Sequence, residues 1–139
     1  VGTDLKPAQR QDPELGVSDR KVTVRFIGTQ DRNVPVKLKP STPSIELNIG
    51  QPTLMAYEAT NKTQADFTGL AVHQVIGHGK VNQTDMLEYI DLEQCFCFDK
   101  QLYPADKTVN LPVSFSIRHS LPEGVHSMTF AYTLYPYDE

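Results

Sequence analysis

The sequence contains little cysteine and no excess of positive charge. Only 2 of its 139 residues are cysteines, which is too few for the disulfide framework that stabilises small secreted domains. Its 13 lysines and arginines are outnumbered by 17 aspartates and glutamates, so the chain lacks the basic surplus that neutralises a phosphate backbone. Nucleic acid is therefore not a predicted partner.

Long hydrophobic runs are also missing. No stretch reaches the roughly 18 consecutive apolar residues that a membrane-spanning helix needs, and the start of the chain does not resemble a signal peptide. Because the chain begins at Val1, we expect any membrane anchor or targeting segment to lie upstream of it. The length suits one domain with a single core.

Signatures of common enzymes are absent as well. The sequence has no Gly-x-Ser-x-Gly elbow, no His-Glu-x-x-His zinc motif and no glycine-rich phosphate loop. Hydrolase and nucleotide-dependent activities are therefore not predicted, and we expect a protein that is not an enzyme.

What the sequence does contain is apolar residues at every second position, which is the period of a half-buried strand. The runs are Val22, Val24 and Phe26; Val34, Val36 and Leu38; Ile45, Leu47 and Ile49; and residues 53–60, 67–76, 89–98, 108–117 and 127–135. These roughly eight strands, with no helical period, predict an all-β, immunoglobulin-like antiparallel β-sandwich. Residues 1–19 are polar and aperiodic, so we expect a flexible tail or linker there and the folded domain over residues 20–139.

The two cysteines, Cys95 and Cys97, lie at the end of one of these predicted strands. Continued alternation would place Phe96 and Phe98 in the core and both thiols on the opposite, polar face. Residues two apart on a strand lie about 6.6 Å apart at Cα, so a disulfide would require local bending. Two thiolates on one metal tolerate sulfurs up to roughly 4.6 Å apart, which favours chelation.

Two thiolates favour copper(I), because structural zinc normally takes four ligands and the sequence has no second cysteine pair. The alternative is that both cysteines are small apolar core residues, since free cysteine is often buried. His73 falls within a predicted strand and is interpreted as a packed or hydrogen-bonded histidine. Met86, in a predicted loop, stays open as a thioether ligand, whereas Met55 and Met128 are predicted core residues.

Around the cysteines, several motifs resemble the CtaG family of cytochrome c oxidase assembly proteins. They are Cys95-Phe96-Cys97-Phe98, then Gln101, Val109-Asn-Leu-Pro-Val113 and Phe115, then Met128-Thr-Phe-Ala-Tyr-Thr-Leu134, and upstream Tyr57, Ala59, Asn61, Gly69 and Ala71. The chain departs from the family in having no third cysteine within residues 1–20 and in carrying His73-Gln-Val-Ile-Gly77 where the family has Tyr-Asn-Val-Thr-Pro.

The resemblance implies a copper(I) chaperone that delivers copper to the CuB centre of cytochrome c oxidase subunit I, with Cys95 and Cys97 as the metal ligands. It also implies an anchor in the inner membrane through an upstream helix, with the domain on the periplasmic side, or on the intermembrane-space side in a mitochondrion. Because two thiolates are few, we expect either a homodimer when copper is bound or recruitment of a further cysteine upstream of this chain. We also expect a donor protein that supplies the metal. A thiol-disulfide redox protein and a passive immunoglobulin-like interaction module are the alternatives.

Overall fold

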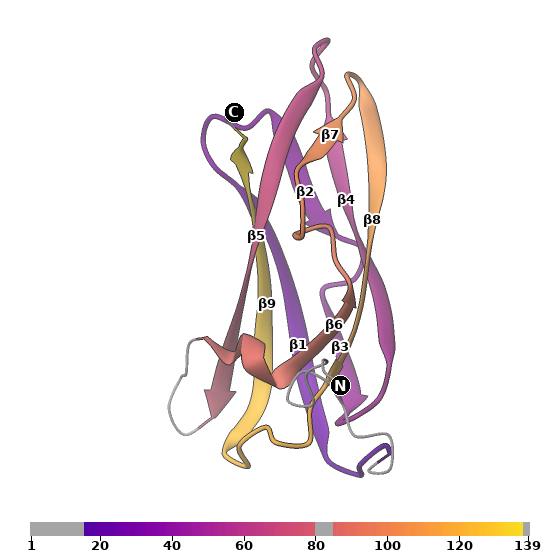
Figure 1. The fold of residues 1–139 in the computed structure, drawn as a ribbon, viewed down its shortest axis with the longest axis vertical. Coiled ribbons are helices and arrows are strands. Elements are labelled where there is room, and N and C mark those ends of the chain that lie inside the picture. The colour runs from indigo at the N-terminus through magenta and orange to yellow at the C-terminus, as the bar shows by residue number, and fades with distance from the viewer. Residues whose placement is uncertain (1–15, 80–84, 138–139) are drawn as a thin grey trace, which may run out of the picture.

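Two β-sheets pack face to face in the computed structural model, which describes residues 16–79 and 85–137 (Figure 1). The five-stranded sheet has the order β3-β1-β9-β5-β7, with β1 at Lys21–Gln30, β3 at Ser44–Asn48, β5 at Phe67–Gly79, β7 at Gln101–Tyr103 and β9 at Val125–Pro136. The four-stranded sheet has the order β2-β4-β8-β6, with β2 at Val36–Pro40, β4 at Thr53–Asn61, β6 at Ile90–Gln94 and β8 at Lys107–Ile117. A single-turn 3-10 helix, η2, covers Met86–Tyr89.

The predicted immunoglobulin-like β-sandwich is confirmed, and its core consists of the inward-facing positions of the alternating runs. Phe26 of β1 packs edge-on against Phe130 of β9 and against Phe115 of β8, with ring centroids 5.6 and 6.3 Å apart. All three rings are almost fully buried. Every second side chain of each strand points into the space between the sheets. The apolar residues at every second position of the sequence therefore form one continuous core there.

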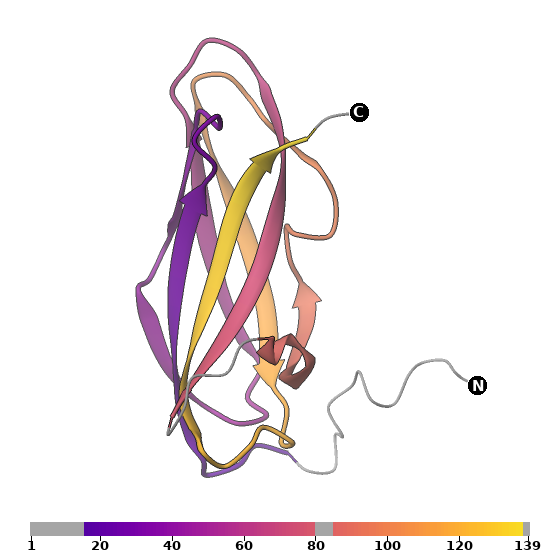
Figure 2. The ribbon, with the colours of Figure 1, turned by 90° about the vertical axis from the view of Figure 1, so that its left-hand side faces the viewer.

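Two features differ from the predicted set of strands. Strand β7, of only three residues, is too short to show a period, so the sequence did not predict it. The strands are also not all antiparallel, because β1 runs parallel to β9 from Thr23↔Ser127 to Gln30↔Leu134. Figure 2 shows β1, β9 and β5 side by side, with β9 between the other two.

Like the connections between the other consecutive strands, the segment between β6 and β7 crosses from one sheet to the other. Strand β6 is an edge strand of the four-stranded sheet, and β7 is an edge strand of the five-stranded sheet. Residues 95–100 connect them. Since β7 pairs with β5 only over Phe67–Gly69, the crossing segment passes beside the part of β5 that follows this pairing. Both cysteines lie in this connection.

At the start of the described chain, Ser18 is already bonded to the sandwich. Its backbone N–H donates to the Ile49 carbonyl at 2.8 Å, and its own carbonyl accepts from the Asn48 side chain at 2.7 Å. Most of the predicted tail, residues 1–15, lies outside the described residues. None of the helical turns within residues 16–79 and 85–137 has the length and apolar character that crossing a bilayer requires.

Candidate metal site at the edge of the sandwich

The strand that leads to the cysteines ends earlier than the sequence predicted. In the pairing of β6 with β8, Leu92 faces Phe115 but Gln94 faces Ser114, so the register shifts by one residue between them. Strand β6 then ends at Gln94, and Cys95 begins a turn. Such a bulge reverses which face the following side chains occupy. The predicted strand over residues 89–98 is therefore too long, and its regular alternation ends at Leu92.

The two phenylalanines consequently have different environments. Phe96 is 8% exposed and packs against Tyr57 and Tyr132, with ring centroids 5.7 and 4.6 Å apart. Phe98 is 67% exposed and lines a surface pocket with Leu87 and other residues. The prediction that both rings enter the core is confirmed for Phe96 and wrong for Phe98, because the turn carries the chain away from the sheet after Cys97.

The cysteines form a disulfide with each other, with their Cα atoms 5.3 Å apart. This separation is shorter than in an extended strand because both residues lie in the turn. Both side chains are half-buried and pack against the edge of the hydrophobic core, so they do not share an open polar face as predicted. The prediction that a disulfide is disfavoured was based on the Cα separation of two residues in an extended strand. Because both cysteines lie in a turn, that separation does not apply to them.

Facing the disulfide is His73, on strand β5. It lies between Ala71 and Val75, which are both buried, whereas the intervening Val72 and Gln74 are exposed. Alternation therefore turns the imidazole of His73 toward the interior of the sandwich. The imidazole stacks on the ring of Tyr132, its register partner on β9, with centroids 4.2 Å apart and planes 12° from parallel.

Burial determines the protonation state of His73. It lowers the pKa of the imidazole from about 6.5 to about 4, because the charged form loses its hydration. Both ring nitrogens are buried, and neither has a hydrogen-bond partner among the described residues. His73 is thus a packed histidine, as predicted, and it forms no hydrogen bond with the residues that the structure describes.

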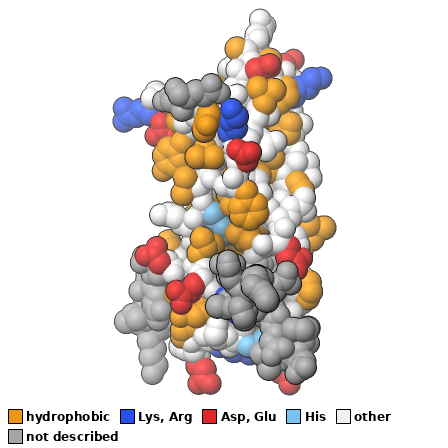
Figure 3. All heavy atoms as spheres, viewed as in Figure 1, with side chains coloured by type: hydrophobic (Ala, Val, Ile, Leu, Met, Phe, Trp, Pro, Cys, Tyr) orange, Lys and Arg blue, Asp and Glu red, His pale blue; other side chains and the backbone are white. Residues whose placement is uncertain are grey.

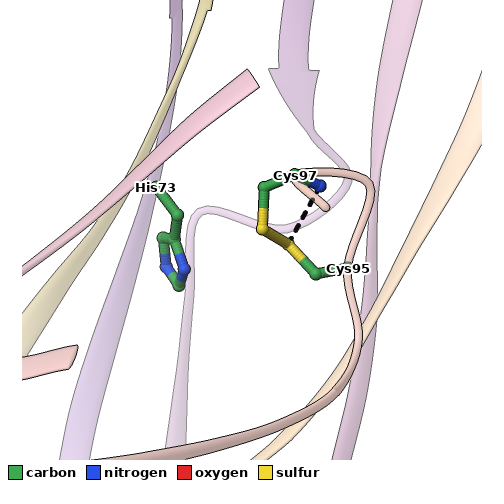
Figure 4. A group of neighbouring side chains, drawn as sticks. All are labelled: His73, Cys95 and Cys97. Carbon is green, nitrogen blue, oxygen red and sulfur yellow. Dashed lines mark hydrogen bonds between the residues drawn. A yellow bond between two sulfur atoms is a disulfide. The ribbon is translucent and has the colours of Figure 1, made fainter. Parts of the chain in front are cut away.

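Together, His73, Cys95 and Cys97 form a group whose potential ligand atoms all lie within 4.8 Å of one another. Figure 4 shows the imidazole and the two sulfurs facing each other across the space between β5 and the crossing segment. Halfway along the face seen in Figure 3, hydrophobic side chains lie beside a histidine at the surface. A neutral imidazole and two thiolates form a donor set suited to copper(I) or zinc.

Tyr132 connects the two halves of this group. Its hydroxyl lies 3.1 Å from Cys95 Sγ, and because a disulfide sulfur carries no hydrogen, the hydroxyl donates. Burial raises the pKa of Tyr132, so the phenol stays protonated at neutral pH. The Cys97 backbone N–H also donates to Cys95 Sγ, at 3.2 Å. Both donors would stabilise a thiolate at Cys95 once the disulfide is reduced.

The remaining candidates from the sequence lie elsewhere. Met86, expected in a loop, is 2% exposed and packs in the core, as do Met55 and Met128. The sequence did not predict His73 as a member of the group. The alternation of side chains along β5 did indicate that His73 points inward, as Ala71 and Val75 do.

Comparison with known proteins shows that the sequence of the chain is similar to those of oxidase assembly proteins. The family model described as "Cytochrome c oxidase assembly protein CtaG/Cox11" matches residues 1–136. A protein named cytochrome c oxidase assembly protein CtaG, from Ruegeria sp. TM1040, is 34% identical over 127 residues, which is 88% of this chain and 62% of that protein. The CtaG of Rhodopseudomonas palustris BisB18 is 36% identical over 84% of this chain and 56% of its own length.

A eukaryotic relative also matches. The protein named cytochrome c oxidase assembly protein COX11, mitochondrial, from Dictyostelium discoideum is 32% identical over 82% of this chain and 36% of its own length. Among solved structures, the ASH/PapD-like domain of human CEP192 aligns with 100% of this chain and 96% of its own at 10% identity. Its TM-score of 0.37 is too low to support a shared fold, so the fold assignment rests on the strand topology. The chain spans 62% of the length of the Ruegeria relative.

Proposed function

The chain belongs to the CtaG/Cox11 family of cytochrome c oxidase assembly proteins, and from this premise we propose that it is a copper(I) chaperone in which Cys95 and Cys97 carry the metal. The cargo would be delivered to the CuB centre of oxidase subunit I. The observation that supports this is the pair of cysteine side chains in one turn at the edge of the sandwich, half-buried and facing a third donor.

The chemistry of the cysteine pair suits a copper carrier better than a copper-storage protein. Soft thiolates select copper(I), which is satisfied by two or three such ligands. Because the cysteines lie in a connection between edge strands and remain partly accessible, an incoming ligand can approach the metal and displace one thiolate at a time. The metal would thus leave by ligand exchange, without unfolding of the domain.

Copper loading requires that the disulfide be opened first. An external dithiol would donate two electrons and two protons, forming two cysteine thiols while its own sulfurs become a disulfide. Both thiols then lose their protons as copper(I) binds, since the thiolate is the ligand form. The disulfide itself favours a second candidate, a thiol-disulfide redox protein, in which this exchange would be the function.

The rest of the proposal concerns location and partners. Relatives named as oxidase assembly proteins occur in bacteria and in a mitochondrion, which supports a location at a membrane. We propose an inner-membrane anchor upstream of residues 1–19, which would act as a linker to the domain at 20–139. The domain would lie on the periplasmic or intermembrane-space side and receive copper from a donor protein. Pairing of two copper-loaded chains, which would bring four thiolates together, stays a prediction.

The test is anaerobic titration of the reduced chain with copper(I) against a chromophoric copper(I) chelator. We expect the wild type to bind one copper per chain, and the double variant C95S/C97S to bind none, because serine removes both soft ligands. A control variant, His126→Phe, alters an exposed histidine and should bind as the wild type does. A double serine variant that retains stoichiometric copper would refute the chaperone proposal. If the wild type binds no copper but exchanges its disulfide rapidly with dithiols, the redox candidate replaces the chaperone.

A further inference from the structure

We propose that His73 is the third ligand of the copper(I) site, so that a single chain holds the metal through two thiolates and one imidazole. This inference rests on the proposed function, because it requires Cys95 and Cys97 to bind copper. It adds a third ligand to the cysteine pair. A single chain can then form a three-coordinate site without a second copy of the chain.

Within the described part of the chain, the two ring nitrogens of His73 are unsatisfied polar atoms. Buried side-chain nitrogens almost always have a hydrogen-bond partner, and an exception calls for an explanation such as an ion. Both nitrogens of His73 are buried without a partner among the described residues. The imidazole nevertheless faces the two sulfurs, as Figure 4 shows. A metal shared with the sulfurs would satisfy one of these nitrogens.

The distances between the three potential ligand atoms suit one bound ion. A thiolate sulfur lies about 2.3 Å and an imidazole nitrogen about 2.0 Å from a bound d10 ion, so the two can be roughly 4.3 Å apart at most. The ligand atoms of His73, Cys95 and Cys97 are within 4.8 Å of one another while the disulfide is still closed. Reduction breaks the bond between the sulfurs and frees both side chains to rotate. A small rotation toward His73 brings all three atoms into range of one ion.

Packing fixes the position of the imidazole beside the sulfurs. It stacks on Tyr132, whose ring is fully buried and whose hydroxyl contacts Cys95 Sγ. One tyrosine therefore fixes the position of the nitrogen ligand and that of one sulfur ligand.

The experiment is X-ray absorption spectroscopy on the whole chain, reduced, freed of reductant and loaded anaerobically with one equivalent of copper(I). We expect a first shell of two sulfurs and one nitrogen, with the outer-shell scattering of an imidazole, and a monomer by analytical ultracentrifugation. His73→Phe keeps a flat ring against Tyr132 but removes the donor, so its spectrum should lose the nitrogen. His126→Phe, at an exposed position, is the matched control and should retain it.

Competition with the chelator gives a second measurement. Loss of an outer-shell partner already costs about tenfold or more in metal affinity, so loss of a ligand should weaken copper(I) binding of His73→Phe at least tenfold. The cysteine-only site should still bind one copper. Thermal unfolding of the variant shows whether its fold is intact, and the wild-type spectrum is decisive even if it is not.

The outcomes separate this inference from the proposed function. Copper bound through sulfur alone in the wild type, or unchanged affinity in His73→Phe, overturns the role of His73 but leaves the chaperone proposal standing. A copper–copper distance with three sulfurs per metal in a dimer also overturns it, because the thiolates would then be shared between two chains. Wild-type chain that binds no copper(I), or C95S/C97S that binds it fully, overturns both.

Discussion

At the scale of single residues, the sequence motif Cys-Phe-Cys-Phe contains two phenylalanines with opposite structural roles. The ring of Phe96 is buried against Tyr57 and Tyr132, whereas Phe98 projects from the surface. The prediction that both rings are buried assumed a continuous strand, but neither phenylalanine lies in a strand.

A pair of truncations measures this difference. Phe96→Ala should lower the free energy of unfolding by about 3 kcal/mol, through lost burial and the cavity left behind. Phe98→Ala should change it by less than about 0.5 kcal/mol, because the position is exposed. Chemical denaturation of both variants, with the disulfide intact, provides the measurement, and similar losses at the two positions would contradict the environments described.

The buried imidazole of His73 makes the metal-free protein sensitive to acid. Its pKa is about 4 when folded, against an ordinary value near 6.5 when unfolded. Between these values the unfolded chain binds more protons, so this contribution to stability is fully present above pH 6.5 and is lost as the pH falls toward 4. The loss should be on the order of 3 kcal/mol.

The check is denaturant unfolding of the oxidised, metal-free chain at several pH values from 7 to 4. His73→Phe should lose less stability over this range than the wild type, because it lacks the titrating group. Carboxylates titrate in both proteins, so the difference between the two curves isolates the histidine. Parallel curves would mean that His73 is not held in its neutral form by the fold.

At the scale of elements, β1 and β2 approach each other closely although they belong to different sheets. A Cβ atom added at Gly28 of β1 would lie 2.7 Å from the backbone carbonyl oxygen of Leu38 on β2. Gly28 also faces Tyr132 in the register of β1 and β9. The glycine is needed because a backbone, which cannot rotate away, occupies the space.

Gly28→Ala should therefore destabilise the domain by about 1–3 kcal/mol, since the two strands must separate to admit the methyl group. Gly124→Ala is the matched control, because an added Cβ there meets nothing within 4 Å and the backbone is not in the left-handed region. Thermal melts of the two variants should differ by several degrees. If Gly124→Ala proved as destabilising as Gly28→Ala, close packing of β1 on β2 would not be the cause.

Most elements were predictable, and the exceptions have specific causes. In β1 and β8, apolar residues recur at every second position and nearly all of them are buried as the sequence pattern predicted, although β1 extends to Gln30. The bulge between Leu92 and Gln94 carries no signal in a single sequence, because Glu93 and Gln94 are both polar and suit either face. That one-residue shift moved the cysteines off the predicted strand and changed every conclusion about their exposure.

For the whole molecule, the sequence pattern predicted the β-sandwich but not which sheet edges meet. The candidate site joins β5 with a segment that begins 22 positions after His73, at Cys95, and crosses between the sheets. Periodicity identifies which residues face inward, and His73 satisfies that criterion. It does not show that the crossing segment passes beside this part of β5, so the third member of the group required the three-dimensional structure.

The central place of β9 sets the order in which this protein can be assembled during synthesis. Strand β9 lies between β1 and β5, yet it is later in sequence than every other strand of its sheet. As the ribosome releases the chain from its N-terminus, β1 and β5 emerge without the strand that joins them. Tyr132, which lies on β9, supports both His73 and Cys95. The sulfurs and the imidazole therefore meet only after this last strand has been translated, so a nascent chain displays its cysteines before the candidate metal site can form.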